Sequence, residues 1–252
     1  MIKKIFYTKY KVNLIRLGNN YDGGYLIPES IIKKTKLLLS FGLGTDWSFE
    51  KNFKDINENV KINCYDHTIN RKFWYEYTIV SVFFFIKNFK NFNNIFTFFK
   101  YKNFFSQKNV KHIQKKIVSK KFNYHDISID EIIKKFKNEK LFLKIDIEGD
   151  EYRIIDKLKF FKNMIGFIIE FHDIDYHHKK ISHFLNNNKN FKIVHVSPNN
   201  MGGVGKKNEP IVVEITFINL NIFKDFKKLK SKFVSKNKLD FPNDPKKKNL
   251  II

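Results

Sequence analysis

The chain has 252 residues, 42% of them hydrophobic, which is enough for the core of one α/β domain and too few for a second full domain. Its 48 basic and 25 acidic residues give a formal charge of +23, which would attract phosphates, nucleic acid or an anionic membrane surface. Only Arg16, Arg71 and Arg153 are arginines, so the bidentate contacts that read guanine and phosphate are scarce, and nucleic acid is not the favoured partner.

The cysteine content and the hydropathy pattern indicate the cellular compartment of the protein. Cys64 is the single cysteine, which excludes an intrachain disulfide and a thiolate metal cluster within one chain. The basic N-terminus has no uninterrupted apolar segment with a small-residue cleavage site, so a secretory signal is not expected. The most hydrophobic window, residues 78–86, is shorter than the roughly 20 residues that span a bilayer. We expect a cytoplasmic protein without a transmembrane segment.

Turn signals and charge divide the chain into three predicted parts. Residues 1–35 form an N-terminal extension with a loop at Asp22-Gly23-Gly24-Tyr25, residues 36–219 form the main domain, and residues 220–252 form a basic tail that is surface-bound or mobile. The paired glycines of the loop would let the backbone approach another group closely. The turn chemistry by itself favours a plain hairpin between Ile15 and Tyr25.

A short apolar segment, residues 36–41, predicts a buried strand that runs into the turn Gly42-Leu43-Gly44-Thr45-Asp46 and then into a helix. Strand, glycine turn and helix form a nucleotide-type cradle, because glycines permit close approach and Asp46 or Ser48 can cap the helix. The next strand, residues 61–65, ends in Asp66 and His67. Asp66 follows the glycine turn by about 20 residues, the spacing at which a carboxylate accepts both hydroxyls of a ribose. A helix cap is the alternative role of Asp66.

Aromatic residues crowd residues 71–115, where lysines are interleaved with them. Such a pattern could stack bases and hold phosphates, as in proteins that bind single strands. Phe85, Phe89, Phe92, Phe96 and Phe99 recur at spacings of three and four, which is typical of one buried helical face. We therefore favour an insertion of helices packed on the sheet, as a lid or a substrate pocket, with a membrane-contacting patch as the alternative.

The later strands are predicted from apolar runs, and two of them end in polar side chains. Strand character is found at residues 115–119, 141–147, 165–171, 191–196 and 211–218, with a helix at 173–188, a loop at 197–205 and an antiparallel last strand. Asp146 and Glu148 share one face at the end of the central strand, and Glu170 and His172 do so at the next. Because the carboxyl ends of strands in an open α/β sheet form the ligand crevice, acids and histidines gathered there predict a site.

The segment Leu143-Lys144-Ile145-Asp146-Ile147-Glu148-Gly149-Asp150-Glu151 resembles the FkbM-type methyltransferases, a branch of the S-adenosylmethionine-dependent class I fold. Ser128-Ile129-Asp130 and Ile169-Glu170-Phe171-His172 add to the likeness, which covers residues 37–218. The resemblance implies an α/β, Rossmann-like fold: a mostly parallel seven-stranded sheet with an antiparallel last strand and helices on both faces. One departure is the turn after the first strand, where Ser40-Phe41-Gly42 replaces an Asp-x-Gly-x-Asn-type sequence and no strand-end acid is present.

The resemblance also implies S-adenosylmethionine as the cofactor and methyl transfer to a hydroxyl of a saccharide or another small metabolite. The residues expected to bind the cofactor are Gly42, Gly44, Asp46, Asp66 and His67. Asp146 or His172 would take the hydroxyl proton, because an in-line displacement needs a positioned oxygen and a base. The residues expected to bind the substrate are Glu148, Glu170, His195, Asn199 and Asn200.

Three alternatives stay open. Asp146, Glu170 and His172, together with Glu148 and His195, offer oxygen and nitrogen ligands for a divalent ion that could acidify a hydroxyl, although a metal is not the favoured prediction. The charge and the aromatic content also suit a nucleic-acid-binding protein or an RNA methyltransferase. The atypical glycine turn suits a catalytically silent scaffold that keeps only the fold.

Overall fold

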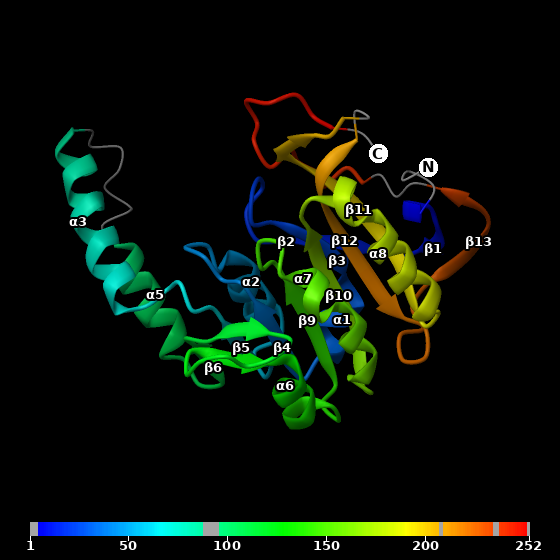
Figure 1. Cartoon of the computed structure of the whole chain (residues 1–252), viewed down its shortest axis with the longest axis horizontal. Helices are drawn as coiled ribbons and strands as arrows, with labels where there is room; N and C mark the ends of the chain where they lie inside the picture. The colour runs from blue at the N-terminus through cyan, green and yellow to red at the C-terminus, as the bar shows by residue number, and fades with distance from the viewer. Residues whose placement is uncertain (1–4, 88–95, 207–208, 234–236, 251–252) are drawn as a thin grey trace.

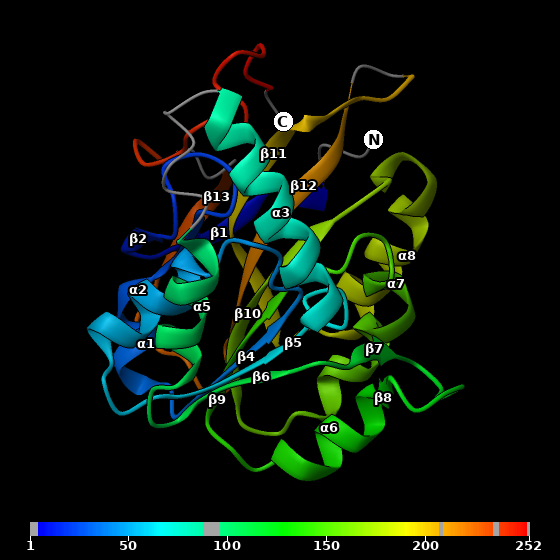
Figure 2. The ribbon, with the colours of Figure 1, turned by 90° about the vertical axis from the view of Figure 1, so that its left-hand side faces the viewer.

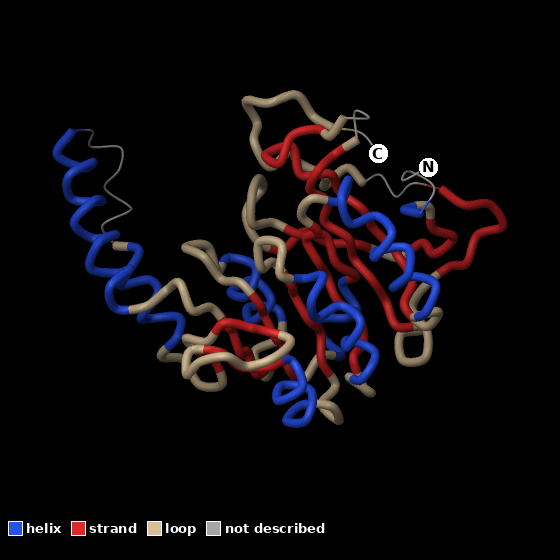
Figure 3. The backbone as a smooth tube through the Cα atoms, viewed as in Figure 1, coloured by secondary structure: helices blue, strands red, loops and turns tan. Residues whose placement is uncertain are grey.

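The computed structural model describes residues 5–87, 96–206, 209–233 and 237–250. Its centre is one seven-stranded sheet, flanked by helices and by small two-stranded sheets (Figures 1 and 3). In spatial order, the strands of the central sheet are β11 (Phe191–Val204), β12 (Pro210–Asn219), β10 (Met164–Phe171), β9 (Leu141–Ile145), β4 (Leu37–Phe41), β5 (Lys61–Tyr65) and β6 (Val110–Ile113). The helices are α1 (Glu29–Lys34), α2 (Ser48–Ile56), α3 (Arg71–Lys87), α5 (Thr97–Phe105), α6 (Ile129–Phe136), α7 (Glu151–Ile154), the 3-10 helix η3 (Ile155–Phe160) and α8 (Ile174–Asn187).

The direction of the strands confirms the predicted fold class. Strands β6, β5, β4, β9 and β10 are parallel to one another, and β12 runs antiparallel to both of its neighbours, β10 and β11. The chain leaves β4 toward β5 and β6 on one side and later returns to place β9 and β10 on the other. Strands β4 and β9 therefore flank the point where the strand order reverses, and ligands of open α/β sheets bind at the carboxyl edge of such a point.

Two details of the predicted sheet are wrong. The third strand of the sheet is β6, whereas the expected segment, residues 115–119, contains β7 (Lys116–Val118), which pairs with β8 (Asp126–Ser128) in a separate sheet. The predicted loop at residues 197–205 is mostly a continuation of β11, because Ser197, Pro198 and Asn199 still pair with β12. An apolar run indicates a strand, but partners distant in the sequence decide which sheet it joins.

The central strand β9 is buried on both faces, as expected for a parallel strand with helices on each side. Leu141, Leu143 and Ile145 pack in a cluster with residues of α6, α7, η3 and α8. Phe142 points the other way, packs in the cluster of α1 and α2, and stacks on Phe53 with ring centroids 6.1 Å apart. The alternation along this strand fixes which side chains reach each layer.

The N-terminal segment packs on the face of the sheet that α1 and α2 cover. Strands β2 (Leu14–Leu17) and β3 (Tyr25–Pro28) form an antiparallel hairpin, and Tyr25 and Ile27 are buried in the same cluster as α1 and α2. Thr216 of β12 fastens this hairpin, since its hydroxyl donates to the Leu26 carbonyl oxygen at 2.6 Å. The loop between β2 and β3 is thereby held at the carboxyl edge of the central sheet.

Part of the basic tail has regular structure. Strand β13 (Lys227–Phe233) pairs antiparallel with β1 (Thr8–Lys11), so the two ends of the chain form one small sheet. Further along the tail, Asp244 N–H donates to the Asn200 side-chain oxygen at 2.7 Å. These contacts tie parts of residues 220–252 to β1 and β11.

The aromatic insertion forms an arm rather than a layer on the sheet. Helices α3 and α5 extend together away from the body of the molecule (Figures 1 and 2). The base of the arm is packed: Trp74 is 6% exposed and Phe104 is 3% exposed. The predicted buried face is wrong for Phe96 and Phe99, which are 40% and 64% exposed. The side chains of Phe85, Phe89 and Phe92 lie outside the described residues.

A helical period identifies residues that share a face without saying what covers that face, which is why the helices were predicted correctly and their packing was not. Among the described residues, no helix has both the length and the apolar character needed to cross a bilayer.

Candidate functional site

A cavity of about 610 Å³ opens at the carboxyl edge of the sheet, beside the ends of β4, β5 and β9. Its walls come from the glycine turn after β4, the tips of β5 and β9, the β2–β3 loop and the start of β7. The lining residues are Asp22, Gly23, Tyr25, Gly42, Leu43, Gly44, Thr45, Asp46, Tyr65, Asp66, His67, Thr68, Lys115, Lys116, Ile117, Lys144, Asp146, Ile147, Glu148 and Asp150. All five residues predicted to bind the cofactor are among them, as are Asp146 and Glu148.

The glycine turn touches the end of the central strand. Gly42 has φ +82° and donates its N–H to the Tyr65 carbonyl oxygen at 3.0 Å. A Cβ atom on Gly42 would lie 1.6 Å from the carbonyl oxygen of Asp146, so both the backbone angle and the space require glycine. A Cβ atom on Gly44 would meet no atom within 4 Å. The turn is therefore closed against Asp146 at Gly42 and open at Gly44.

Asp66 holds this turn in place. One carboxylate oxygen accepts the N–H groups of Leu43 and Gly44 at 2.9 and 3.0 Å, and the other accepts the N–H and hydroxyl of Thr68 at 2.7 and 2.6 Å. Burial acts to raise the pKa of Asp66, but these hydrogen bonds outweigh it and the pKa is lowered. Since two oxygens accept about four hydrogen bonds in all, a ribose hydroxyl would have to replace one of these donors.

The N-terminal loop also reaches the site. A Cβ atom on Gly23, whose φ is +78°, would lie 2.3 Å from a carboxylate oxygen of Asp46, and Asn19 donates its amide to the same oxygen at 2.7 Å. The hairpin favoured by turn chemistry does form, and it also supplies Asp22, Gly23 and Tyr25 to the cavity wall. The signal in the sequence was the pair of glycines, whose role in close approach could not be separated from a plain turn.

A buried ion pair lies behind the turn. Lys144 donates its ammonium to the Gly42 carbonyl oxygen at 3.1 Å and lies 3.9 Å from a carboxylate oxygen of Glu50, which belongs to α2. The hydroxyl of Ser40 donates to the same oxygen of Glu50. Ser40 stands where the related turns were expected to carry an acid, and Glu50 brings a carboxylate there from the following helix. Burial raises the pKa of Glu50, although Lys144 and Ser40 act against the rise.

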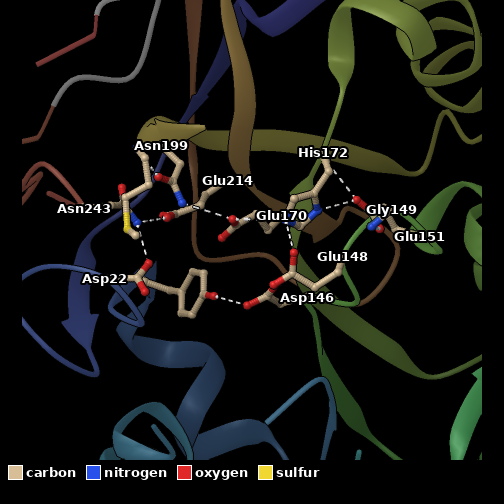
Figure 4. Close-up of polar contacts among 12 residues, drawn as sticks. Asp22, Asp146, Glu148, Gly149, Glu151, Glu170, His172, Asn199, Glu214 and Asn243 are labelled. Atoms are coloured by element: carbon tan, nitrogen blue, oxygen red, sulfur yellow. Dashed lines mark hydrogen bonds and ion pairs between the residues drawn. The ribbon is translucent and has the colours of Figure 1, made fainter. Parts of the chain in front are cut away.

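Asp146 and His172 lie next to each other at the far side of the turn (Figure 4). Asp146 accepts the Tyr25 hydroxyl at 3.0 Å, and one ligand-type atom from each of Asp146, Glu148 and His172 lies within 4.8 Å of the others. Burial acts to lower the pKa of His172, but the hydrogen bond and charge of Glu151, with the charges of Asp146 and Glu148, raise it. The two side chains predicted to be catalytic, Asp146 and His172, are therefore neighbours in the structure.

A second cluster of buried polar groups continues from there along β10 and β12. Glu170 and Glu214 are paired in register across these strands, Asn199 donates to Glu170 at 3.0 Å, and Asn243 donates to Glu214 at 2.8 Å (Figure 4). Burial, Asp146 and Glu214 raise the pKa of Glu170 well above its usual range, and burial raises the pKa of Glu214 to about 8. Glu170 and Asn199 thus lie behind the cavity wall and are engaged with each other.

The two other predicted substrate residues point elsewhere. His195 lies 2.8 Å from Asp240 through its Nε2 atom, and burial and the charge of Arg16 lower its pKa to about 3. The amide of Asn200 donates to the Asp244 carbonyl oxygen at 2.8 Å in the tail. Neither residue lines the cavity, because β11 continues past His195 and carries both side chains toward the C-terminal segment.

The charge of the cavity differs from that of the chain. Carboxylates outnumber lysines among the lining residues, although basic residues outnumber acidic ones by 48 to 25 in the whole sequence. One of the lining lysines, Lys116, is paired with Asp150 at 2.9 Å. The lining suits a ligand with positive charge better than a phosphate chain.

No family model matches the sequence, and no curated protein matches it. Among solved structures, the chain resembles the precorrin-6y C5,15-methyltransferase of Geobacter metallireducens at 12% identity and a TM-score of 0.40, over 75% of this chain and 85% of that one. It also resembles M. jannaschii TYW2 in complex with AdoMet at 8% identity and a TM-score of 0.36, over 76% and 74% of the chains. A putative caffeoyl-CoA O-methyltransferase from Staphylococcus aureus matches at 9% identity and a TM-score of 0.34, over 75% and 78%.

The strand order carries the assignment of the fold. Similarity at these scores is too low to carry an argument about activity. The sheet itself, with β12 antiparallel between β10 and β11 and the crevice beside β4 and β9, is of the Rossmann-like α/β type. The chain has that fold.

Proposed function

We propose that the chain is an S-adenosylmethionine-dependent methyltransferase that methylates a hydroxyl group of a saccharide or another small metabolite. The observation that carries the proposal is the shared edge: the glycine turn at Gly42 and the side chains of Asp66 and Asp146 all line one cavity. The resemblance of residues 143–151 to the FkbM-type enzymes supports the same proposal.

The cavity fits the proposed cofactor by shape and charge. Gly44 presents backbone with no atom near its Cβ position, which allows a ligand to lie against the turn. The lining carboxylates complement a ligand that carries a sulfonium and an ammonium group. Bound there, S-adenosylmethionine would supply an electrophilic methyl group.

The residues of the chain would divide the work of holding the cofactor. Gly42 and Gly44 would border it, and Asp46 would stand at the start of α2, where its carboxylate accepts the Ser48 N–H at 2.9 Å. Asp66 would set the shape of the turn through Leu43 and Gly44 and accept a ribose hydroxyl in exchange for one of its present donors. His67 would flank the same end of the cavity.

Proton removal would fall to Asp146 or His172. When the acceptor oxygen forms its new bond to the methyl carbon, the carbon–sulfur bond breaks and the hydroxyl proton must leave, so a base within hydrogen-bond reach accelerates the reaction. Tyr25 orients the Asp146 carboxylate, and Glu151 orients the imidazole of His172 through Nδ1 at 2.7 Å. Of the predicted substrate residues, Glu148 at the cavity wall is the best placed to contact the acceptor, whereas His195 and Asn200 receive no support from the geometry.

Calorimetric titration with S-adenosylmethionine and with its demethylated product tests the cofactor. We expect one binding site per chain in the natural protein and none in Gly42→Ala. Absence of binding to either compound in the natural protein would favour the catalytically silent scaffold.

Transfer of a labelled methyl group to a panel of free and nucleotide-linked sugars and small alcohols then tests the reaction. With the acceptor found, we expect Asp146→Asn or His172→Ala to lower kcat by about 10²- to 10⁴-fold, whereas His183→Ala, on an exposed part of α8, should keep full turnover. Full turnover in both site variants would show that neither side chain is the base.

A further inference from the structure

His172 stands among acidic side chains, two of which, Asp146 and Glu148, line the cavity, and the arrangement is that of a ligand set. Its Nε2 atom lies 3.5 Å from a carboxylate oxygen of Glu148 and 3.5 Å from one of Glu170. One atom each from Asp146, Glu148 and His172 lies within 4.8 Å of the others. Ligands bound to a metal at about 2.1 Å stand about 3 to 4 Å apart, so small side-chain movements would close this set around an ion.

Glu151 fixes the imidazole in the form that a metal requires. Its carboxylate, which is 0% exposed, accepts the backbone N–H of His172 at 2.8 Å and lies 2.7 Å from Nδ1. The other oxygen accepts the Gly149 N–H at 2.8 Å, so the carboxylate is held from both sides. A carboxylate that already accepts these bonds places the proton on Nδ1 and leaves the Nε2 lone pair directed at Glu148 and Glu170. A carboxylate behind a histidine in this way is the usual support of a metal-binding imidazole.

Of the three side chains in this set, Asp146 is held by the sheet and Glu148 is exposed. Asp146 follows the end of β9, and its N–H donates to the Phe41 carbonyl oxygen at 2.8 Å. Glu148 has φ +53°, and its side chain is 87% exposed. Asp146 and His172 are therefore the two ligands held in fixed positions. The exposed side chain of Glu148 can move toward an ion bound beside them (Figure 4).

We propose that Asp146, Glu148 and His172 bind one divalent transition-metal ion such as Mn²⁺, with Glu151 as a positioning residue behind His172. Two carboxylates and one imidazole suit a borderline ion better than Ca²⁺ or Mg²⁺, which prefer all-oxygen sites. Three protein ligands leave positions for water or for an acceptor hydroxyl on the cavity side. The site goes beyond the proposed methyl transfer and does not depend on it.

Titration of MnCl₂ into the full chain, followed by the electron paramagnetic resonance signal of free Mn²⁺, tests the site. We expect one ion bound per chain and an affinity at least tenfold weaker in His172→Ala and in Glu148→Gln. Glu151→Gln touches none of the ion's expected ligand atoms, and we expect it to weaken binding about 10- to 100-fold by releasing the imidazole. His183→Ala and Glu58→Gln, at exposed positions outside the cluster, are the matched controls and should bind as the natural protein does.

The outcomes separate this proposal from the proposed function. Circular dichroism verifies that each variant is folded, and the largely exposed Glu148 keeps the test valid if His172→Ala unfolds. No binding in the natural protein, or equal binding in Glu148→Gln and Glu58→Gln, would overturn the metal site. Mn²⁺ binding without S-adenosylmethionine binding would uphold the metal site and overturn methyl transfer. S-adenosylmethionine binding without Mn²⁺ binding would overturn the metal site and leave methyl transfer standing.

Discussion

Two regions of this molecule use aromatic and charged residues in opposite ways. At the carboxyl edge of the sheet, polar side chains such as Asp66, Lys144 and Glu50 are buried, and each is held by hydrogen bonds or an ion pair. On the α3–α5 arm, large apolar side chains such as Tyr75 and Phe99 are exposed, at 70% and 64%. The usual rule that apolar residues lie inside and polar ones outside is reversed in both places.

The overall composition of the chain describes neither the carboxyl edge of the sheet nor the α3–α5 arm. The charge of +23 gives no hint of a cavity in which carboxylates outnumber lysines, and the aromatic content does not indicate a larger core. Buried polar groups in a network are costly unless every member is satisfied, so small changes at the edge should have large effects. Replacing an exposed side chain on the arm should change the unfolding free energy little, because few contacts are removed. Substitutions in the two regions should therefore differ widely in their effect on stability.

Gly42→Ala should be the most damaging change at the edge. The added methyl group meets the Asp146 carbonyl oxygen in a left-handed backbone, so we expect a loss of unfolding free energy on the order of 4 kcal/mol. Gly44→Ala, with open space at its Cβ position and φ +57°, should cost about 1 kcal/mol. Urea denaturation of the two variants measures the difference, and equal losses would contradict the close contact between the turn and β9.

Neighbouring residues on α3 should behave very differently. Trp74 is 6% exposed and packs on Tyr101 with ring centroids 4.7 Å apart, so Trp74→Ala should cost about 3 kcal/mol. Tyr75→Ala, one position further along, should change the unfolding free energy by no more than about 0.5 kcal/mol. Thermal melts of both variants provide the measurement. A large loss in Tyr75→Ala would mean that the arm is packed beyond its base.

Glu214 should make the stability of the edge depend on pH. Burial raises its pKa to about 8 from the ordinary 4.5, against the hydrogen bond from Asn243 and the charge of Arg16, while Asp146 and Asp22 add to the rise. A group whose pKa is higher in the folded state stabilises it most when protonated, so this stabilisation is complete below about pH 4.5 and is lost as the pH rises toward 8.

The neutral variant Glu214→Gln removes that dependence. We expect its stability relative to the natural protein to increase by on the order of 3 kcal/mol between pH 4.5 and pH 8. Urea unfolding at several pH values measures the gap, with Glu58→Gln at an exposed position as the control. A constant gap across this pH range would show that Glu214 is not the group responsible.

Tyr25→Phe should have the smallest effect at the edge. It removes the hydroxyl that donates to Asp146 at 3.0 Å while keeping the buried ring, so we expect a loss of about 1 kcal/mol. Because Tyr25 belongs to β3, the same variant tests whether the N-terminal hairpin takes part in the site. A lower kcat with an unchanged KM would place Tyr25 among the residues that orient Asp146, and no change in either would confine it to packing.

Much of the fold could be predicted because its strands are strongly apolar and short. β4, β5, β10 and β12 lie where the runs of Leu, Ile, Val and Phe predicted them, and Asp146 follows β9 as the acid-tipped segment indicated. Lys116–Val118 was a strand as predicted, but in a separate sheet, because pairing with β8 depends on residues that no local pattern specifies. Glu50 and Asp22 were missed at the site for the same reason: their places there depend on contacts with other elements, which no local pattern specifies.

Local sequence is enough to specify the alternating buried strand β9, the glycines that tolerate φ above zero after β4, and the cluster of polar residues that follows β9 and ends β10. These features depend on local conformational preference and on the period of two along a strand. Long-range packing sets the rest: Glu50 stands beside Ser40, and the Gly23 loop closes on Asp46. His195 and Asn200 turn toward the tail, and α3 and α5 extend away from the body. Those contacts join residues distant along the chain, and packing and burial, which no local sequence encodes, select them.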